Sequence, residues 1–335
     1  MKAVLCKDYG PPESLVVEDV PSPSAEAGQV VLAVHAAAVN FPDVLIIENK
    51  YQFKPPLPFS PGGEVAGVVQ EVGEGVSTLK VGDRVIGSCG NGGFVEELAI
   101  PATSCIPIPD AMDMETASAL VLTYGTSYYG LKDRAVLKAG EKLLVMGAAG
   151  GVGLAAVELG KAAGAYVIAA ASTAEKLALC KEHGADATLL YPADAMDKDA
   201  QRAFSAQIKD LTDGAGADVI YDPVGGTYAE PALRAINWEG RYLVIGFAAG
   251  DIPKIPLNLT LLKSCQIVGV FWGAFVARDP KANEQNLADL MALYKAGKIA
   301  PHISARYPLA EAGAALRYMS DRKVKGKVIL NVRSK

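Results

Sequence analysis

Only three histidines occur in the 335 residues, and none lies at metal-ligand spacing from a cysteine or carboxylate: His35, His183 and His302. The five cysteines are odd in number, widely scattered and without a C-x-x-C pair: Cys6, Cys89, Cys105, Cys180 and Cys265. A structural zinc site needs four closely spaced ligands, and a catalytic one needs three. We therefore expect no metal site, and we expect thiols that stay reduced and mostly buried.

Long apolar runs and basic runs are also missing. No apolar segment reaches the roughly 18 residues that a membrane-spanning helix needs. The start, Met1-Lys-Ala-Val-Leu-Cys-Lys-Asp, returns to charged residues too soon for a signal peptide. The net charge of −5 and the lack of a basic-aromatic patch argue against nucleic-acid binding. We expect a cytoplasmic protein that contacts neither membranes nor nucleic acids.

The length and composition that are present predict two globular domains. Half of the residues are apolar and 21% are charged, which supplies enough material for two buried cores. The first third is rich in strand signals separated by Pro and Gly, namely 29–39, 63–72 and 82–87, and this spacing suggests a small barrel. From Glu115 the pattern changes, and we place the domain boundary near Leu122.

Beyond that boundary, strands and helices alternate in the manner of a doubly wound parallel sheet. The predicted strands are Lys142–Met146, Tyr166–Ala171, Ala187–Tyr191, Ala217–Asp222, Arg241–Gly246 and Gln266–Val270. The predicted helices are Gly151–Ala163, Ala174–Glu182, Asp199–Thr212 and Tyr228–Asn237, whereas the proline-rich crossover 252–263 reads as irregular. We expect a second domain of residues 123–270. The first domain, 1–122, would be completed by 271–335, with a helix at 283–296 and a closing strand at 325–332.

The most informative segment runs from Gly140 to Gly153, because it joins a buried strand to a glycine-rich turn and then directly to a helix. Gly147, Gly150 and Gly153 fall three apart. In a dinucleotide site the first permits the tight turn, the second lets the backbone approach the phosphates, and the third lets the helix pack closely. A plain βα turn is the alternative. The residues predicted to surround the pyrophosphate are Gly147, Ala149, Gly150, Gly151, Val152 and Gly153.

Cofactor preference is determined at the end of the second strand, where NAD-binding proteins place an acidic residue on the ribose. No carboxylate ends this strand, and Ser172 and Lys176 could bind a 2′-phosphate instead. Glu175 reads better as a helix-dipole partner than as a ribose ligand. We therefore predict NADPH as the cofactor, with a solvated Lys176 as the alternative.

Several motifs resemble the zinc-independent quinone oxidoreductases of the medium-chain dehydrogenase/reductase superfamily, the group that includes ζ-crystallin. The resemblance covers nearly the whole chain. The matching segments are Met1-Lys-Ala-Val, Asn40-Phe-Pro-Asp43, Asn49-Lys-Tyr51, Pro61-Gly-Gly-Glu-Val-Ala-Gly67, Thr126-Ser-Tyr-Tyr-Gly-Leu131, Gly140–Lys161, Asp222-Pro-Val-Gly-Gly226 and Gly326-Lys-Val-Ile-Leu330. Two positions depart from the group: Asn49 replaces a glycine, and Glu158 replaces a glutamine at what we interpret as a helix surface.

The resemblance implies a GroES-like β-barrel catalytic domain plus a Rossmann domain, and a homodimer formed by edge pairing of the cofactor domain. It implies substrate-side roles for Asn40, Asp43 and Tyr51, with Tyr51 the better proton-donor candidate. The alternative is that Asn40 and Asp43 are turn and cap residues and that Tyr51 only packs within its loop. It further adds Thr126, Tyr191, Gly246, Phe247, Phe271 and Trp272 to the predicted cofactor contacts. Plain packing is the alternative for Phe271 and Trp272, and a place at the edge of the core is the alternative for Tyr191.

Zinc-dependent relatives carry a cysteine before the Asp43 position and a histidine where Gly63 stands here, so the resemblance implies that the catalytic metal is missing. Without a Lewis acid, the acceptor itself must delocalise the added charge, as quinones and α,β-unsaturated carbonyls do. We therefore predict hydride transfer to a conjugated acceptor. An enoyl-thioester reductase of the same superfamily, and a cofactor-binding structural protein with little turnover, remain as alternatives.

Overall fold

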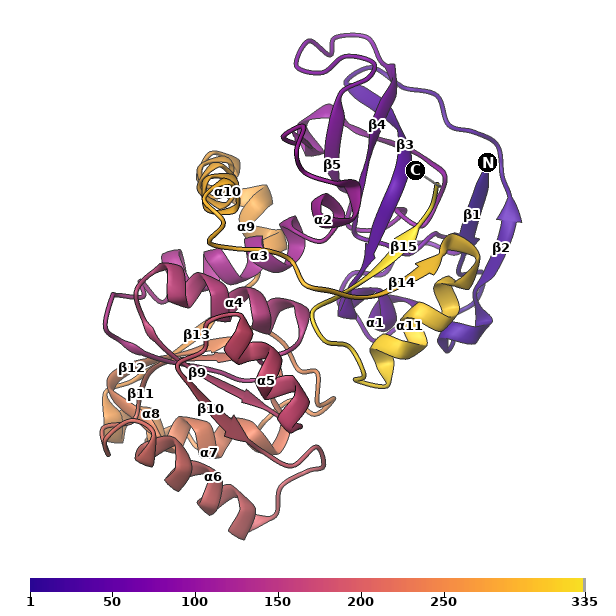
Figure 1. The fold of residues 1–335 in the computed structure, drawn as a ribbon. Helices are drawn as coiled ribbons and strands as arrows, with labels where there is room; N and C mark the ends of the chain where they lie inside the picture. The colour runs from indigo at the N-terminus through magenta and orange to yellow at the C-terminus, as the bar shows by residue number, and fades with distance from the viewer. Residues whose placement is uncertain (334–335) are drawn as a thin grey trace. The chain divides into compact units, whose positions relative to one another are not determined.

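The computed structural model describes residues 1–333, which form two compact units (Figure 1). One unit holds residues 1–122 and the chain from Pro301 onward, and the other holds residues 123–300. The first crossing falls at the predicted position, Leu122. The return falls at Ala300 instead of after Val270, because the two helices that follow Val270 contact the second unit, where Trp272 lies against Gly125.

In its described residues, 1–122 and 301–333, the first unit contains two sheets and three α-helices. Its strands are β1 (Lys2–Leu5), β2 (Val16–Asp19), β3 (Gln29–Val39), β4 (Glu64–Val72), β5 (Arg84–Ser88), β6 (Glu97–Pro101), β7 (Cys105–Pro107), β14 (Ile303–Pro308) and β15 (Lys327–Asn331). Its helices are α1 (Phe41–Ile47), α2 (Met114–Ser118) and α11 (Ala312–Ser320). Strands β1 and β2 pair with each other, and the larger sheet has the order β14-β15-β3-β4-β5-β7, with β6 also paired to β3.

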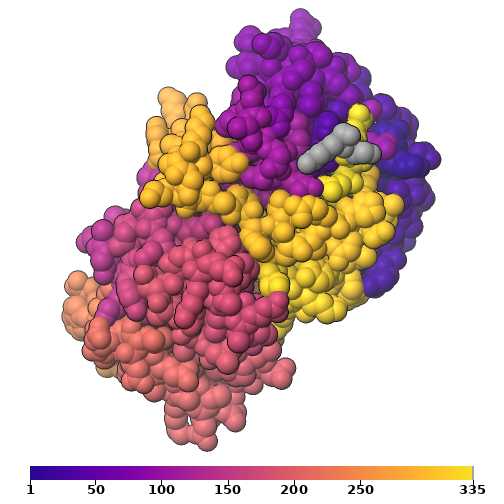
Figure 2. Space-filling model, viewed as in Figure 1, coloured from indigo at the N-terminus to yellow at the C-terminus, as the bar shows by residue number. Residues whose placement is uncertain are grey.

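The N-terminal and C-terminal parts of the chain are joined within this unit. Strand β15 pairs antiparallel with β3, with Val328 opposite Val39. The guanidinium of Arg317 on α11 also pairs with Glu13 at 2.6 Å. Figure 2 shows the yellow C-terminal segment and the indigo N-terminal segment side by side in this unit. Residues more than two hundred positions apart therefore share one core.

The second unit is a six-stranded parallel sheet. Its strands are β8 (Lys142–Val145), β9 (Tyr166–Ala171), β10 (Ala187–Leu190), β11 (Ala217–Asp222), β12 (Ile236–Val244) and β13 (Gln266–Gly269). Its helices are α3 (Val121–Tyr128), α4 (Gly151–Ala162), α5 (Ala174–Glu182), α6 (Lys198–Asp210), α7 (Ala229–Arg234), α8 (Asn258–Lys263), α9 (Trp272–Arg278) and α10 (Pro280–Lys295). The order β10-β9-β8-β11-β12-β13 is that of a doubly wound dinucleotide fold, so this prediction is confirmed.

Two details of the predicted elements are wrong. Strand β12 begins at Ile236, not at Arg241, because Ile236 already pairs with Ala217 before a register shift, and the helix before it ends at Arg234. The crossover thought to be irregular contains helix α8, which begins only after Pro256, where proline no longer removes a helical hydrogen bond. Among the helices of residues 1–333, none is both long and apolar enough to span a bilayer.

Candidate functional site

The glycine loop after β8 has the geometry that its sequence predicts. Gly147 has φ of 57°, a conformation that favours glycine. A Cβ on Gly153 would lie 2.3 Å from the Gly147 carbonyl oxygen and 2.8 Å from Ala148 Cα, so only glycine lets α4 approach the loop this closely. A Cβ on Gly150 would meet only the Gly147 oxygen, at 3.4 Å, and otherwise open space. The loop therefore leaves room for a ligand beside Gly150, at the N-terminus of α4, where unpaired backbone N–H groups favour an anion.

The residues predicted to read the 2′-phosphate lie at the carboxyl end of β9. Ser172 directly follows the strand, and Lys176 lies in the first turn of α5, where its backbone N–H donates to Thr173 Oγ1 at 3.2 Å. Ser172 and Lys176 are both half-buried. Because all six strands are parallel, this end of β9 lies at the same edge of the sheet as the glycine loop. Their contact with a cofactor stays a prediction.

Tyr191 follows β10 at this edge and is buried in an aromatic cluster. Its ring lies edge-on to Phe204 at 6.0 Å between centroids and tilted against Tyr228 at 5.0 Å. The structure thus gives Tyr191 a packing role, and a cofactor contact would have to involve the part of the residue that the cluster does not cover.

The remaining predicted cofactor contacts fall into two groups. Gly246 and Phe247 follow β12, and a Cβ on Gly225 would meet Phe247 Cδ1 at 2.8 Å, which brings the β11 and β12 loops together. Phe271 is exposed, whereas Trp272 covers Gly125 on α3, next to Thr126, and its indole N–H donates to Asn283 Oδ1 at 3.2 Å. The packing interpretation of Trp272 therefore has direct support.

In the first unit, Asn40 and Asp43 form the start of α1. Asp43 Oδ2 accepts from the Asn40 backbone N–H at 2.8 Å, and Asp43 Oδ1 accepts from Gly62 N–H at 3.2 Å. Asn40 and Asp43 are 4% and 2% exposed. The capping interpretation of the two residues therefore has direct structural support. Their contact with a substrate stays a prediction.

The sequence did not single out two residues that join this polar cluster, Glu64 and Lys327. Lys327 Nζ donates to Asn40 Oδ1 at 2.6 Å and to Glu64 Oε1 at 2.8 Å, and Asn40 Nδ2 donates to Glu64 Oε1 at 3.1 Å. Glu64 Oε2 accepts from Leu122 N–H at 2.9 Å. Both residues lie inside the motifs Pro61–Gly67 and Gly326–Leu330 that carried the resemblance. The signal was a charged residue within an apolar strand pattern, which demands a buried partner.

Burial and neighbouring charge set the protonation of this cluster. Burial raises the pKa of Asp43 to about 7, against the opposing effect of its two N–H donors and of Lys327. Burial, together with the negative charge of Asp43, also raises the pKa of Tyr51. The Tyr51 hydroxyl is therefore protonated at neutral pH, and a protonated hydroxyl can donate a hydrogen bond to a substrate oxygen.

Two departures from the group have structural explanations. Asn49 adopts φ of 58°, the left-handed conformation, which accounts for the glycine of its relatives. The expectation that Glu158 lies on a helix surface is wrong, because it is 6% exposed. Its carboxylate contacts three groups, Tyr124 Oη at 2.6 Å, His183 Nδ1 at 2.6 Å and Ala300 N at 3.0 Å, which explains why a charge is tolerated there.

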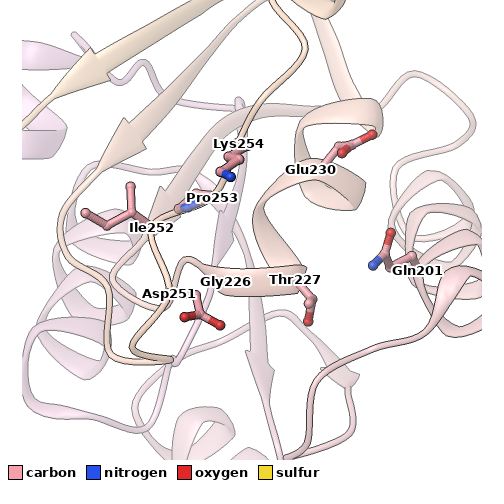
Figure 3. A pocket seen from close by; sticks show the side chains of 8 residues that line it. All are labelled: Gln201, Gly226, Thr227, Glu230, Asp251, Ile252, Pro253 and Lys254. Carbon is pink, nitrogen blue, oxygen red and sulfur yellow. The ribbon is translucent and has the colours of Figure 1, made fainter.

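A cavity of about 420 Å³ opens elsewhere on the second unit (Figure 3). It is lined by Gln201, Gly226, Thr227, Glu230, Asp251, Ile252, Pro253 and Lys254. None of these was a predicted site residue. The side chains in Figure 3 point in different directions and do not converge on one point, so the glycine loop remains the better candidate for a cofactor site.

The two-unit fold, its dinucleotide-type sheet and the glycine loop after β8 are those of a reductase or dehydrogenase. Comparison with known proteins agrees: residues 26–110 match the family "Alcohol dehydrogenase GroES-like domain", and residues 151–292 match "Zinc-binding dehydrogenase". The chain is 41% identical to a quinone oxidoreductase-like protein 2 homolog of Nematostella vectensis, over 99% of this chain and 89% of the relative. It is 33% identical to a quinone oxidoreductase of Rattus norvegicus, over 94% of this chain and 92% of the relative. A mycobacterial structure solved with NADPH matches at 31% identity with a TM-score of 0.91, covering 99% of this chain and all of that one.

The chain therefore belongs to the medium-chain dehydrogenase/reductase superfamily, in its zinc-independent quinone oxidoreductase group. The predicted combination of a GroES-like domain and a Rossmann parallel sheet is confirmed. The protein is an oxidoreductase of this superfamily.

Proposed function

We propose that this protein is an NADPH-dependent reductase of quinones or other conjugated carbonyl acceptors, which works by hydride transfer without a metal. The observation that carries the proposal is the glycine loop at the carboxyl edge of the sheet, with open space beside Gly150. The NADPH bound to the mycobacterial relative and the name of the rat relative support the choice of cofactor and acceptor.

The residues of the second unit fit NADPH. Backbone N–H groups at the start of α4 suit the pyrophosphate, and no acidic residue ends β9 to repel a 2′-phosphate. Ser172 would donate its hydroxyl to that phosphate, and Lys176 would neutralise its charge. When bound, the nicotinamide supplies the hydride. The protein supplies orientation, and this alone can contribute several kcal/mol to catalysis.

The metal-free step is supported by what occupies the ligand positions of zinc-dependent relatives. The segment from Asn40 to Asp43 lacks the cysteine of those relatives, and the Asn40 amide oxygen accepts from Lys327. Glu64, directly after the Gly63 position, accepts from the same ammonium group. A quinone or enone spreads the added charge over its own conjugated oxygen, so a hydrogen bond from Tyr51 would suffice to stabilise it.

We also propose a homodimer formed through the free edge of β13. This strand ends the sheet, and Ile267 on it is 40% exposed. Helix α8 and its N-cap, which precede β13 in the chain, expose three leucines: Leu257, Leu261 and Leu262 are 76%, 79% and 64% exposed. An unpaired edge strand together with exposed leucines is typical of a surface that pairs with another chain.

We propose a cytoplasmic location as well. The five free cysteines support it, because free thiols suit a reducing compartment.

The test is NADPH oxidation by chelator-treated protein, with an ortho-quinone, an α,β-unsaturated ketone and crotonyl-CoA compared under identical conditions. We expect turnover with the quinone or the ketone, and no change in rate when zinc is added back. Faster turnover of crotonyl-CoA would replace the proposal with an enoyl-thioester reductase. Tight NADPH binding without turnover of any acceptor would favour a cofactor-binding protein of little activity.

A further inference from the structure

Asp222 ends strand β11 at the point where the strand order reverses. Strands β8 and β11 are neighbours in the sheet, although the chain passes from β8 through β9 and β10 before it reaches β11. The two loops at this reversal, after Met146 and after Asp222, flank the crevice where dinucleotides bind to such sheets. Asp222 is only 3% exposed, so its carboxylate faces the protein interior.

Each oxygen of this carboxylate has protein donors. Oδ1 accepts from the backbone N–H groups of Val224 at 2.7 Å and Gly225 at 3.0 Å. Oδ2 accepts from the Tyr242 hydroxyl, on the neighbouring strand β12. Burial raises the pKa of Asp222, and these three donors oppose that rise. The Asp222 side chain thus closes the turn that follows its own strand, and the hydrogen bond from Tyr242 holds the carboxylate in place.

The turn that Asp222 closes touches the glycine loop on one side. A Cβ on Gly147 would lie 3.0 Å from Val224 Cγ2 and 3.5 Å from Pro223 Cγ. The first glycine of the loop therefore packs directly against this turn. The start of the loop is also held by Ala148 N–H, which donates to the Ala170 carbonyl at 3.0 Å, so the turn supports the loop together with this bond.

The same turn is joined to the loop after β12 on its other side. Ala248 N–H donates to the Pro223 carbonyl at 3.0 Å, and Ala249 N–H donates to the Val224 carbonyl at 2.8 Å. Gly225 contacts Phe247, one of the predicted cofactor residues. One carboxylate therefore fixes a turn that contacts both of the loops proposed to face the cofactor.

We infer that Asp222, held by Tyr242, is a positioning residue that keeps the glycine loop and the Gly246–Asp251 loop in their cofactor-binding conformation. The inference rests on the proposed NADPH site. Asp222 itself need not touch the cofactor, because it acts through Val224 and Gly225. Its effect should appear in cofactor affinity and not in the hydride-transfer step.

The variants that test this are Asp222→Ala and Asp222→Asn. Asp222→Ala leaves two backbone N–H groups without an acceptor, and we expect the Kd for NADPH to rise on the order of tenfold to hundredfold, with kcat at saturating NADPH nearly unchanged. Asp222→Asn keeps an oxygen for both N–H groups and offers its amide N–H to the Tyr242 oxygen, so it should restore most of the affinity.

The matched control is Thr212→Ala, at the opposite end of β11. Thr212 is fully buried, accepts from Gly216 N–H at 3.0 Å and donates to the Ile208 carbonyl at 2.7 Å. Thr212 also closes a loop, the one that precedes β11, but this loop lies at the opposite edge of the sheet from the glycine loop. We expect Thr212→Ala to lower Tm without changing the Kd for NADPH. A Kd that rises equally in Thr212→Ala and Asp222→Ala would overturn the inference, as would a wild-type Kd in Asp222→Ala.

Amide hydrogen exchange of the cofactor-free protein separates this inference from the proposed function. We expect Asp222→Ala to accelerate exchange in segments 147–153 and 223–226, and Thr212→Ala to leave both unchanged. If the wild-type protein failed to bind NADPH, the proposed cofactor would be wrong, while exchange would still decide the role of Asp222. Unchanged exchange in Asp222→Ala would refute it.

Discussion

Lys327 Nζ lies 2.6 Å from Asn40 Oδ1, a hydrogen bond between residues 287 positions apart in the chain. The pairing of β15 with β3 creates it, because Val328 opposite Val39 sets the next two residues, Lys327 and Asn40, side by side. The same ammonium group neutralises Glu64. The candidate substrate residues thus depend on the last strand of the chain.

Removing the Lys327 charge should destabilise the first unit strongly. Lys327→Met leaves the buried Glu64 carboxylate without its counter-ion, and we expect a loss of about 3–5 kcal/mol in the free energy of unfolding. Denaturant titration measures this loss. Lys7→Met, which breaks the half-exposed pair with Glu18, is the control and should change little. Adding Glu64→Gln to Lys327→Met should recover most of the loss, and a failure to do so would contradict the ion-pair explanation.

The stability contributed by Asp43 should decrease as pH rises. Its pKa is about 7 in the folded protein and about 3.9 in the unfolded chain, so the folded state binds the extra proton between these values. Folding is therefore favoured most below about pH 4 and loses this contribution as pH approaches 7. We expect the difference in unfolding free energy between wild type and Asp43→Asn to fall across that range in denaturant titrations. A difference independent of pH would show that Asp43 is ionised throughout.

Two alanine substitutions in the glycine loop should have opposite effects. Gly153→Ala places a Cβ 2.3 Å from the Gly147 oxygen, so the backbone must move, and we expect a loss of stability of about 1–3 kcal/mol. Gly150→Ala meets open space and should fold normally, but its methyl group would occupy the proposed phosphate path and weaken NADPH binding. Thermal unfolding and fluorescence titration distinguish the two. Normal NADPH affinity in Gly150→Ala would argue that the loop is only a turn.

Lys176→Glu should weaken NADPH binding far more than NADH binding. The new carboxylate would face the 2′-phosphate that NADH lacks. Kd values for both cofactors provide the measurement. Lys181→Glu, which makes the same charge change in the last turn of α5, should leave the ratio of the two Kd values unchanged. Equal weakening of NADPH and NADH by Lys176→Glu would remove the basis for the NADPH preference.

Leu261→Asp should convert the proposed dimer into a monomer. Leu261 is 79% exposed on α8, the helix that precedes the edge strand β13 in the chain, and a charge there would have to be desolvated if this surface paired. Light scattering after size-exclusion chromatography measures the mass. Leu190→Asp, at the other edge strand and 55% exposed, should leave the mass unchanged. A wild-type protein that is monomeric at all concentrations would refute the dimer.

The second unit was predictable because its information is local. Strand β8 is a short apolar run that leads directly into the glycine loop and then into α4, and β9 is followed at once by Ser172 and the N-cap residue of α5. Helix α5 begins and ends where the sequence placed it, with Thr173 as its N-cap. The end of the preceding helix before β12 was not predictable, because the pairing of Ile236 with Ala217 decided it.

The polar cluster of the first unit was only half predictable, since its partners come from distant parts of the chain. Asn40 and Asp43 carry a local capping pattern, but nothing near them in sequence indicates Lys327. Glu158 was misplaced on a surface for the same reason, because its partners Tyr124, His183 and Ala300 come from three separate segments. Side-chain partners across a fold follow from strand register and helix packing, which no single segment encodes.

Glu158 has a further consequence for how the gene could be rearranged. It accepts from Tyr124, the second residue of the second unit, and from Ala300, the last residue of that unit. The start and the end of the second unit are therefore held close together by hydrogen bonds to one side chain, as the two ends of an inserted domain are. A related Rossmann unit could replace this one without longer connections to the first unit, provided that it carries its own residue that hydrogen-bonds to both of its ends.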